Sequence, residues 1–304
     1  MTILVRVAAL LLAAALGVGA ASGAGAQCRT ERQTEVAVTR MGNVPLAMVR
    51  VNEATATFLV DTGAERTILS KVAAKQLGIE AHYEYARPMH SLGGGLVSGD
   101  ARLHTLGLGT AALANFRVLV GSISLPDVAG RPLDGLLGAD FLSSFEVDLD
   151  LPHDRLALYE RPACAVAMPS WSQPYTAIPA NRSLHDRLFF PVRLDGHTLA
   201  ALIDTGAQLT VLDAETAASI GVTGAQLSRD PSANLRGAAA EIVRSHAHRF
   251  TRLEIGGEVM RDPVIVVTRL GLQDADLILG ADFLRSHRVW LSYGSHRVFI
   301  GRSS

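Results

Sequence analysis

Two aspartates stand at corresponding places in two similar stretches of the chain, FLVDTGAERTIL and LAALIDTGAQLTVL. They are Asp61 and Asp204, 143 residues apart, and each follows an apolar, strand-like run and enters a Thr-Gly turn. Two carboxylates held about 3 Å apart cannot both ionise readily, so they hold one proton between them over a wide pH range. The unprotonated partner can take a proton from water while the protonated partner donates to a carbonyl under attack. Such a pair could hydrolyse a peptide bond with no metal, no other cofactor and no covalent intermediate.

The flanks of the two aspartates align at the same offset without a gap. Upstream, residues 49–51 (VRV) match residues 192–194 (VRL), and a turn-like pair follows each run. Downstream, Ser70 and Asp213 are good N-cap residues, and each opens a short helical pattern that ends at a glycine. Two unrelated segments would not share strand, turn and cap, so the sequence indicates an internal duplication.

A second repeated motif lies near the end of each half. DGLLGADFL at residues 134–142 matches DLILGADFL at residues 276–284, and a strand pair with a turn follows each copy. Gly138 lies 77 residues after Asp61, and Gly280 lies 76 residues after Asp204. A glycine inside a strand is needed where another backbone passes close by, so we expect close packing at both glycines.

The two halves are separated by a proline-rich segment, residues 161–178, which cannot form a long helix. We therefore expect an N-terminal lobe over residues 27–160 and a C-terminal lobe over residues 179–304. Each half has many short alternating strands, frequent glycines and one clear helical pattern, which predicts an all-β protein of two similar lobes. Lobes related by a pseudo-twofold axis bring equivalent points together near that axis, where the two aspartates would face each other.

The residues after each aspartate suit such a meeting point. The hydroxyls of Thr62 and Thr205 could bridge the two loops across the axis. Gly63 and Gly206 would let each backbone turn back closely, with N–H donors facing the carboxylates.

The two D-T-G-A motifs, each with its apolar-apolar-glycine strand, resemble those of the aspartic proteases. The match is closest to the retropepsin-like group, specifically to exported bacterial members with two lobes fused in one chain, and it covers nearly all of the mature sequence. The resemblance implies that each lobe is a closed β-barrel, that catalytic Asp61 and Asp204 meet at the interface, and that a hairpin flap covers an extended polypeptide substrate. It also implies an interface built partly from terminal strands, which suits residues 33–38 and the last residues of each lobe. We expect a monomer with an intramolecular pair of aspartates.

Two features depart from the pepsin pattern within that family. Pepsin-like enzymes generally have Ser or Thr after the DTG glycine, whereas this chain has Ala64 and Ala207, which predicts a mildly acidic pH optimum. The predicted flap contains no tyrosine and is rich in glycine; it consists of Ser91, Leu92, Gly93, Gly94 and Gly95. The corresponding residues 234–237 make a poorer flap, so the lobes are not expected to contribute equally.

Other polar residues have simpler interpretations. Asp140 and Asp282 each begin a short DFL segment after a glycine, so we expect them to cap a helical turn. His246 and His248 share one face of a strand and could bind a metal, but a solvated strand face is favoured because no further ligand is evident. The motifs H-E-x-x-H and G-x-S-x-G are absent.

Two alternatives to catalysis remain at this point. One is a catalytically silent protein that binds peptides with this fold, and the other is a structural envelope protein with a vestigial protease fold. Both aspartates and both threonines are intact, which favours catalysis.

The N-terminus has the layout of a secretory signal peptide over residues 1–26. Arg6 precedes a long apolar run, and Ala24-Gly25-Ala26 forms a cleavage site before Gln27. We expect export to the periplasm or the medium, with no stable membrane span after cleavage. An uncleaved membrane anchor is the alternative, since the apolar run approaches spanning length.

The chain has two cysteines, Cys28 and Cys164. An even count in an exported chain favours a disulfide, and two free buried thiols are the alternative.

The composition excludes one broad class of partner. The chain has 28 basic and 29 acidic residues, a net charge of -1, and no long basic run, so nucleic acid is not an expected partner. Its 304 residues, 48% of them hydrophobic, can bury the core of two ordinary domains.

Overall fold

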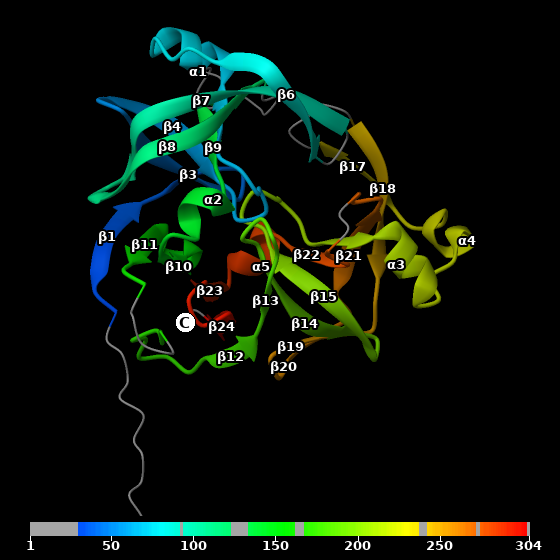
Figure 1. Cartoon of the computed structure of the whole chain (residues 1–304). Helices are drawn as coiled ribbons and strands as arrows, with labels where there is room; N and C mark the ends of the chain where they lie inside the picture. Colours follow the sequence, from blue (N-terminus) through cyan, green and yellow to red (C-terminus); the bar gives the residue numbers. More distant parts are fainter. Residues whose placement is uncertain are drawn as a thin grey trace, which may run out of the picture.

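Strands dominate the computed structural model, which describes residues 30–91, 94–122, 133–161, 167–236, 242–271 and 274–302 (Figure 1). Within residues 84–97 and at residues 234, 236 and 242 it describes the backbone alone. The predicted signal peptide, Cys28 and Cys164 lie outside the described residues, so export, cleavage and the disulfide stay predictions. None of the described helices is long and apolar enough to span a membrane.

The first lobe is a closed six-stranded barrel. Its strands follow one another around the ring in the order β3 (Val44–Val51), β4 (Ala54–Val60), β9 (Gly135–Leu137), β5 (Ile68–Ser70), β8 (Ala111–Gly121) and β7 (Gly94–Leu108). The ring closes because β3 pairs antiparallel with β7, with Val49 opposite Leu108. In β3 the side chains alternate, so that Val49 and Val51 are buried while Met48 and Arg50 face outward.

The second lobe repeats this ring with its long strands interrupted. The equivalent order is β14 (Leu188–Leu194), β15 (His197–Ile203), β22 (Leu277–Leu279), β16 (Val211–Asp213), β21 (Val264–Thr268) and β18 (Ile242–Arg249). The connection back to β14 is made by β19 (Arg252–Ile255), which follows β18 after two residues and pairs with β20 (Glu258–Arg261). The break between β20 and β21 falls at Asp262, which has φ 50, and Pro263, which has no N–H to donate.

Short helices lie where the duplicated caps predict them. Helix α1 (Lys71–Gln76) begins after Ser70, whose hydroxyl accepts from Ala73 N–H at 3.0 Å. Helix α3 (Ala214–Ser219) begins after Asp213, whose carboxylate accepts from Glu215 N–H at 2.8 Å. Three further helices and a 3₁₀ turn are present in the described residues: α2 (Ala139–Leu142), α4 (Gly224–Leu227), α5 (Ala281–Leu284) and η1 (Leu151–His153).

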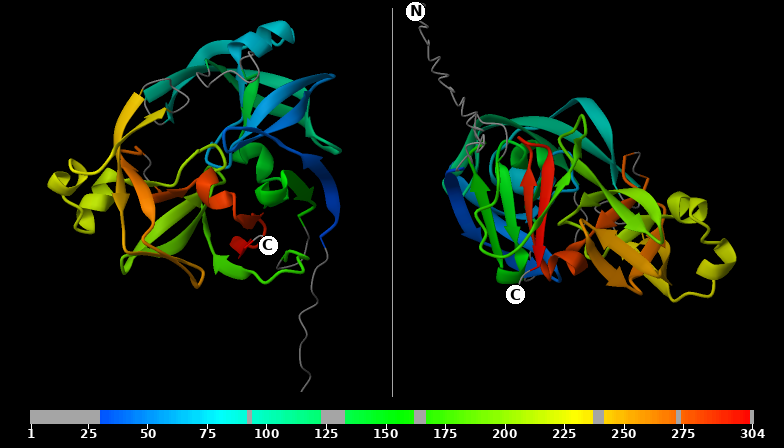
Figure 2. Two further views of the ribbon diagram at one scale, coloured as in Figure 1. Left: turned by 180° about the vertical axis from the view of Figure 1, so that it is seen from behind. Right: turned by 90° about the horizontal axis from the view of Figure 1, so that it is seen from below.

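A six-stranded sheet joins the lobes. Its order is β1 (Arg32–Ala37), β11 (Arg155–Tyr159), β10 (Glu146–Asp150), β23 (His287–Ser292), β24 (Arg297–Arg302) and β12 (Thr176–Pro179). The lobes meet in the middle, where β10 pairs with β23 and Val147 lies opposite Leu291. The strands run side by side in the right-hand view of Figure 2. The sheet therefore contains the terminal strands that the resemblance implied, and β12 includes the last residues of the predicted linker.

A β-hairpin extends from each lobe. Strand β6 (His82–Ser91) pairs with β7 in the first lobe, and β17 (Ser232–Arg236) pairs with β18 in the second. In Figure 1 the end of β6 approaches β17 and β18. The short strands β2 (Thr39–Met41) and β13 (Asn181–Arg182) precede β3 and β14 and pair with them.

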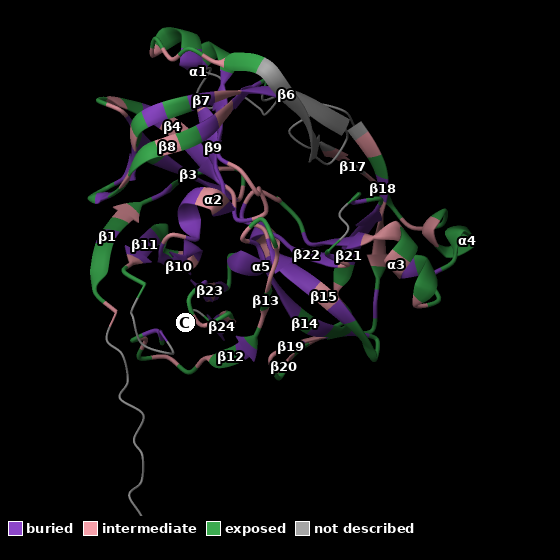
Figure 3. Ribbon diagram, viewed as in Figure 1, coloured by how far each residue is buried: buried purple, intermediate pink, exposed green. Residues whose placement is uncertain are grey.

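Burial follows the inner strands (Figure 3). One apolar cluster runs through both lobes, from Phe58 and Leu137 in the first to Phe190 and Leu279 in the second. A protein of this size is expected to bury such a core, and here it holds the strands that end at the two aspartates.

Candidate active site

Each candidate aspartate lies just beyond the end of an inner strand. Asp61 follows β4 and Asp204 follows β15, and each of these strands is paired in parallel with the short strand that carries the Leu-Gly motif. The N–H of Asp61 donates to Leu137 O and that of Asp204 to Leu279 O, both at 3.0 Å. The duplicated sequences therefore hold both aspartates in the same way, and both residues are half-buried.

Thr62 and Thr205 join the two loops. Each threonine hydroxyl accepts the N–H of the other threonine at 3.1 Å. Each hydroxyl also donates across the interface, Thr62 to Ile203 O at 2.7 Å and Thr205 to Val60 O at 2.6 Å. All four groups are thus paired in a region where Thr62 is 2% and Thr205 0% exposed.

The backbone turns hold one oxygen of each carboxylate. Gly63 and Ala64 N–H donate to Asp61 Oδ1 at 3.0 and 2.9 Å. In the second loop, Gly206 and Ala207 N–H donate to Asp204 Oδ1 at 2.8 and 3.2 Å. Each carboxylate keeps its other oxygen free of these bonds.

The two glycines let the carboxyl groups come together. A Cβ atom at Gly63 would lie 2.4 Å from Cγ of Asp204, and one at Gly206 would lie 2.6 Å from Cγ of Asp61. Each carboxyl group therefore packs on the loop of the opposite lobe. No other residue type fits these two positions without displacing an aspartate.

The pair is electrostatically coupled. Burial raises the pKa of Asp61 well above its ordinary value, and the negative charge of Asp204 and a side-chain hydrogen bond to it raise it further. Burial also raises the pKa of Asp204, while the hydrogen bond with Asp61, the N–H donors of Gly206 and Ala207, and the charge of Arg187 oppose that rise. The two carboxyls can therefore share a proton.

The close approach predicted at the Leu-Gly glycines is confirmed. A Cβ at Gly138 would lie 2.6 Å from the carbonyl carbon of Arg66, and one at Gly280 would lie 2.4 Å from Leu209 O. Both neighbours are backbone atoms of the aspartate loops. Each glycine thus lets one strand support the loop of its own lobe.

The capping role expected for Asp140 is wrong. The N-cap of α2 is Gly138, without a side-chain bond, because Asp140 lies inside the first turn and points back toward the loop. Its carboxylate accepts from Thr67 N–H at 2.8 Å and Thr67 Oγ1 at 2.6 Å, and it pairs with Arg66 at 3.0 Å. Asp140 therefore braces the loop of Asp61.

Asp282 occupies the equivalent place in the second lobe. It accepts from Thr210 Oγ1 at 2.8 Å and from Phe283 N–H at 2.9 Å, while Gly280 is the N-cap of α5. Leu209 stands where the first lobe has Arg66, so this brace has no ion pair at that position. The second copy is the weaker one.

The predicted flap is a hairpin in the structure, as far as it is described. Ser91 pairs with Gly94 and His90 with Gly95 at the end of β6 and β7. Leu92 and Gly93 lie outside the described residues. The contact of this hairpin with a substrate stays a prediction.

Sequence reasoning missed two cross-lobe contacts beside the aspartates. Glu65 pairs with Arg187 of the other lobe at 2.6 Å. Gln208 donates to Met41 O at 3.0 Å and accepts from Asn43 N–H at 2.9 Å. Glu65 and Gln208 are equivalent in the duplication, and that equivalence is the signal that could have found them.

Of the two histidines on β18, His248 has a carboxylate partner. His248 Nδ1 is bonded to Asp230 at 2.7 Å. In the part of the chain that the structure describes, no group of three or more His, Cys, Asp or Glu residues could hold a metal ion.

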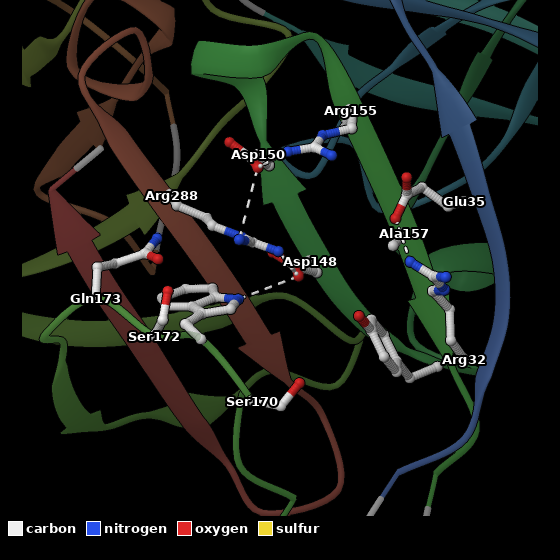
Figure 4. Close-up of a pocket in the computed structure, with 12 residues that line it drawn as sticks. Arg32, Glu35, Asp148, Asp150, Arg155, Ala157, Ser170, Ser172, Gln173 and Arg288 are labelled. Carbon is white, nitrogen blue, oxygen red and sulfur yellow. Dashed lines mark hydrogen bonds and ion pairs between the residues drawn. The ribbon is translucent and has the colours of Figure 1, made fainter. Parts of the chain in front are cut away.

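A polar cavity of about 320 Å³ lies against the interlobe sheet, and none of its lining residues belongs to the aspartate loops (Figure 4). Asp148 of β10 accepts from Arg288 of β23 at 2.9 and 2.6 Å and from Trp171 Nε1 at 3.1 Å. Asp150 pairs with Arg155, and Arg32 pairs with Glu35. The acidic and basic side chains of the cluster pair with one another, and the Asp148–Arg288 pair joins β10 of the first lobe to β23 of the second.

Comparison with solved structures places the architecture in a known class. The crystal structure of aspartic proteinase from Irpex lacteus superimposes with a TM-score of 0.54 over 89% of this chain and 97% of that one, at 16% sequence identity. At that identity the likeness shows the fold, which is the two-lobed fold of an aspartic proteinase. A comparison with curated protein sequences gave no match.

Family membership follows from the sequence profile. The family described as "Aspartyl protease" matches twice, over residues 47–141 and 190–283, which together are more than half of the chain. The chain belongs to this family, with one copy of the family domain in each lobe. The predicted fold class and family are confirmed.

Proposed function

We propose that the protein is an aspartic endopeptidase that cleaves polypeptides bound in an extended conformation. The observation that carries the proposal is the approach of Asp61 and Asp204, one from each lobe, with each carboxyl packed on the glycine of the opposite loop. Family membership supports the reaction class. The protein's own groups suffice for the chemistry.

The reaction follows from one proton shared by two carboxyls. The unprotonated carboxylate takes a proton from a water molecule as the water oxygen bonds to the carbonyl carbon. The protonated carboxyl donates its proton to the carbonyl oxygen, which gives a neutral tetrahedral intermediate. When the C–N bond breaks, the carboxyl that took the proton from water gives it to the amine nitrogen, and the other carboxylate takes a proton from a hydroxyl of the intermediate. The products are an amine and a carboxylic acid, and the pair again holds one proton.

The hairpins support an extended substrate. A strand-like peptide can add to the edge of a β-hairpin through main-chain hydrogen bonds, while alternating side chains enter pockets. The hairpins β6–β7 and β17–β18 offer such edges from both lobes. We propose that Ser91 and Gly94–Gly95 belong to the segment that closes over the peptide.

The proposal is tested by hydrolysis of an unfolded protein by the mature chain, with and without a transition-state-mimicking aspartic protease inhibitor. Inhibitor-sensitive cleavage is the expected result. Inhibitor binding without cleavage would indicate a silent peptide-binding protein, and neither binding nor cleavage would indicate a structural protein.

The single-chain pair is tested by two variants. We expect Asp61→Asn and Asp204→Asn each to abolish cleavage, because each removes one of the two groups that move protons. Mixing the two inactive variants should not restore activity if the pair forms within one chain. Substantial activity of either variant, or restoration on mixing, would show that the site forms between chains.

We further propose export with removal of residues 1–26. The signal layout of the N-terminus supports this proposal. N-terminal sequencing of protein recovered from outside the cytoplasm should start at Gln27. A protein that keeps residues 1–26 and sediments with membranes would support the anchored alternative.

A further inference from the structure

The residues directly after the two D-T-G-A motifs make reciprocal contacts across the lobes. Gln208 of the second lobe reaches the turn between β2 and β3, where it bonds to the backbone of Met41 and Asn43. Glu65 of the first lobe reaches the equivalent turn between β13 and β14, where it meets Arg187. Each aspartate loop is thus attached to the lobe opposite its own.

The charges of these two contacts differ. The Gln208 contact is made of a neutral amide and backbone groups, and the residue equivalent to Arg187 is Val44, the first residue of β3, an apolar side chain 1% exposed. The Glu65 contact is ionic. The duplication therefore loses its electrostatic symmetry close to the aspartate pair.

Arg187 is an unusual arginine. It is 5% exposed, its guanidinium lies 5.3 Å from the centre of the Phe189 ring, and Nε has no hydrogen-bond partner among the described residues. A buried cation keeps a stronger field than an exposed one, because little water screens it. Arg187 directly precedes β14, which pairs antiparallel with β15, so its field acts on the carboxyl that directly follows β15 at the same end of this strand pair.

That carboxyl belongs to Asp204. The charge of Arg187 lowers the pKa of Asp204, against the rise that burial causes. Other ionisable groups of the described residues lie near Arg187. Glu65 is 2.6 Å and Asp274 3.7 Å from its guanidinium, and His185 is 3.8 Å from Glu65. Asp61 faces Asp204 within the aspartate pair.

The acidic neighbours only partly offset Arg187. The side chains of Glu65 and Asp274 are 35% and 56% exposed, so water screens their charges, whereas the side chain of Arg187 is 6% exposed. Asp61 has no cation in the equivalent place, because Val44 stands there.

We propose that Arg187 is a positioning residue that polarises the aspartate pair, so that Asp204 carries the negative charge and Asp61 the proton. This inference rests on the proposed function and assigns the two roles within it. Asp204 then takes the proton from water, and Asp61 donates to the carbonyl oxygen. Glu65 moderates the field of Arg187 and holds it in place.

The first test is the pH profile of kcat/KM for Arg187→Met, Arg187→Lys and Glu65→Gln. Loss of the cation in Arg187→Met should move the acidic limb to higher pH, with kcat/KM on that limb lower by about three-fold for a shift of about half a pH unit. Arg187→Lys should keep the limb in place. Glu65→Gln should move it to lower pH, because it removes an opposing charge.

The acidic limb should move in opposite directions in Arg187→Met and Glu65→Gln, and this difference distinguishes the proposed role from a purely structural one. If Arg187 and Glu65 only connected the lobes, both losses would lower stability and kcat without moving the limb in opposite directions. Limb shifts of the same sign, or no shift in Arg187→Met, would overturn the proposal. Gln208→Leu, which breaks the neutral contact, serves as the matched control and should leave the limb in place.

A second test does not depend on activity. The ¹³C resonances of the aspartate carboxyl carbons can be followed through a pH titration, with Asp61 and Asp204 assigned by their loss in the two asparagine variants. In the natural chain Asp204 should ionise at lower pH than Asp61, and the difference should narrow in Arg187→Met. Identical titrations of the natural chain and Arg187→Met, or ionisation of Asp61 first, would overturn the proposal even if the protein cleaves nothing.

Discussion

The N–H of Thr62 donates to the hydroxyl of Thr205, and the N–H of Thr205 donates to the hydroxyl of Thr62, both at 3.1 Å. The two bonds are related by the pseudo-twofold axis of the molecule, and both lie in its buried interior. They link the two aspartate loops directly, beside the bonds that each hydroxyl donates to the residue before the opposite aspartate. The spacing of the two carboxyls therefore depends on two hydroxyl groups.

Thr205→Val should lower the free energy of unfolding by about 2–4 kcal/mol, because it leaves the Thr62 N–H and the Val60 carbonyl buried without partners. It should also reduce kcat, since the loops lose their reciprocal link. Thr205→Ser keeps the hydroxyl and should retain most of both properties. Urea denaturation of the three proteins measures the effect, and equal stability of the Val and Ser variants would contradict it.

The threonine pair should also be non-additive. Thr62→Val removes the acceptor of the Thr205 N–H, and Thr205→Val removes the acceptor of the Thr62 N–H. Both losses loosen the same contact between the loops, so the double variant should be less destabilised than the two single losses combined. A double-mutant cycle on unfolding free energies measures the coupling. Strict additivity would show that the two bonds act independently.

Gly63→Ala should reduce kcat by about a hundred-fold, because its methyl group would occupy the place of the Asp204 carboxyl and shift it by about 1 Å. Gly224→Ala is the matched control, since a Cβ at Gly224 would meet nothing within 4 Å. The control should keep full activity. An active Gly63→Ala variant would mean that the approach of the two carboxyls is not needed for catalysis.

The duplicated elements could be predicted from sequence because each leaves a local mark. The strand before Asp61, the cap at Ser70 and the glycine at 138 occur twice at matched spacing, and the structure places both copies alike. The repeat marks the positions of Glu65 and Asp140 but not the residues that they contact. Their partners, Arg187 and Thr67, are chosen by packing between segments far apart in sequence.

Only part of the asymmetry between the lobes could be predicted from the sequence. Pro263 interrupts an alternating run and could have predicted that a long strand of the second lobe is interrupted there. The charge difference between Arg187 and Val44 was also visible at the 143-residue offset. The position of Arg187 beside the aspartate pair was not visible in the sequence, because a repeat does not show which side chains contact the opposite lobe.

Arg288→Met should destabilise the protein by about 3–5 kcal/mol, because it leaves Asp148 as an unpaired carboxylate in the sheet that joins the lobes. Asp148 is 1% exposed, and burial already raises its pKa despite the opposing effect of Arg288. The double variant Asp148→Asn/Arg288→Met should recover part of the loss. Arg32→Met, which breaks an exposed pair, should change stability by less than about 1 kcal/mol.

The loss in Arg288→Met should depend on pH. A carboxyl whose pKa is higher in the folded than in the unfolded state stabilises the fold at low pH, and that contribution is lost as pH rises through the folded-state pKa. Removal of the cation raises the pKa of Asp148 further, so the variant should be closer to the natural chain at pH 4 than at pH 7. A pH-independent difference in melting temperature would contradict this.

Asp61→Asn should raise the melting temperature at neutral pH while it abolishes cleavage. Burial and the charge of Asp204 raise the pKa of Asp61 above its unfolded value, so the folded state is penalised once pH exceeds that raised pKa. The amide cannot ionise, and the penalty disappears. The gain should be smaller at pH 4, and a gain that does not change with pH would contradict this prediction.

The pH profile of activity should have its maximum in the mildly acidic range. Catalysis needs one proton on the pair: below the lower apparent pKa both carboxyls are protonated and no base remains, and above the higher one no acid remains. Burial raises the pKa of both Asp61 and Asp204, and the alanines at positions 64 and 207 add no hydroxyl that would stabilise the anions. Both limbs should therefore lie at higher pH than an exposed aspartate, with a pKa of about 4, would give. Measurement of kcat/KM on one peptide across the acidic range checks this, and a maximum below about pH 3 would mean that the carboxylates are stabilised by groups other than those seen around them.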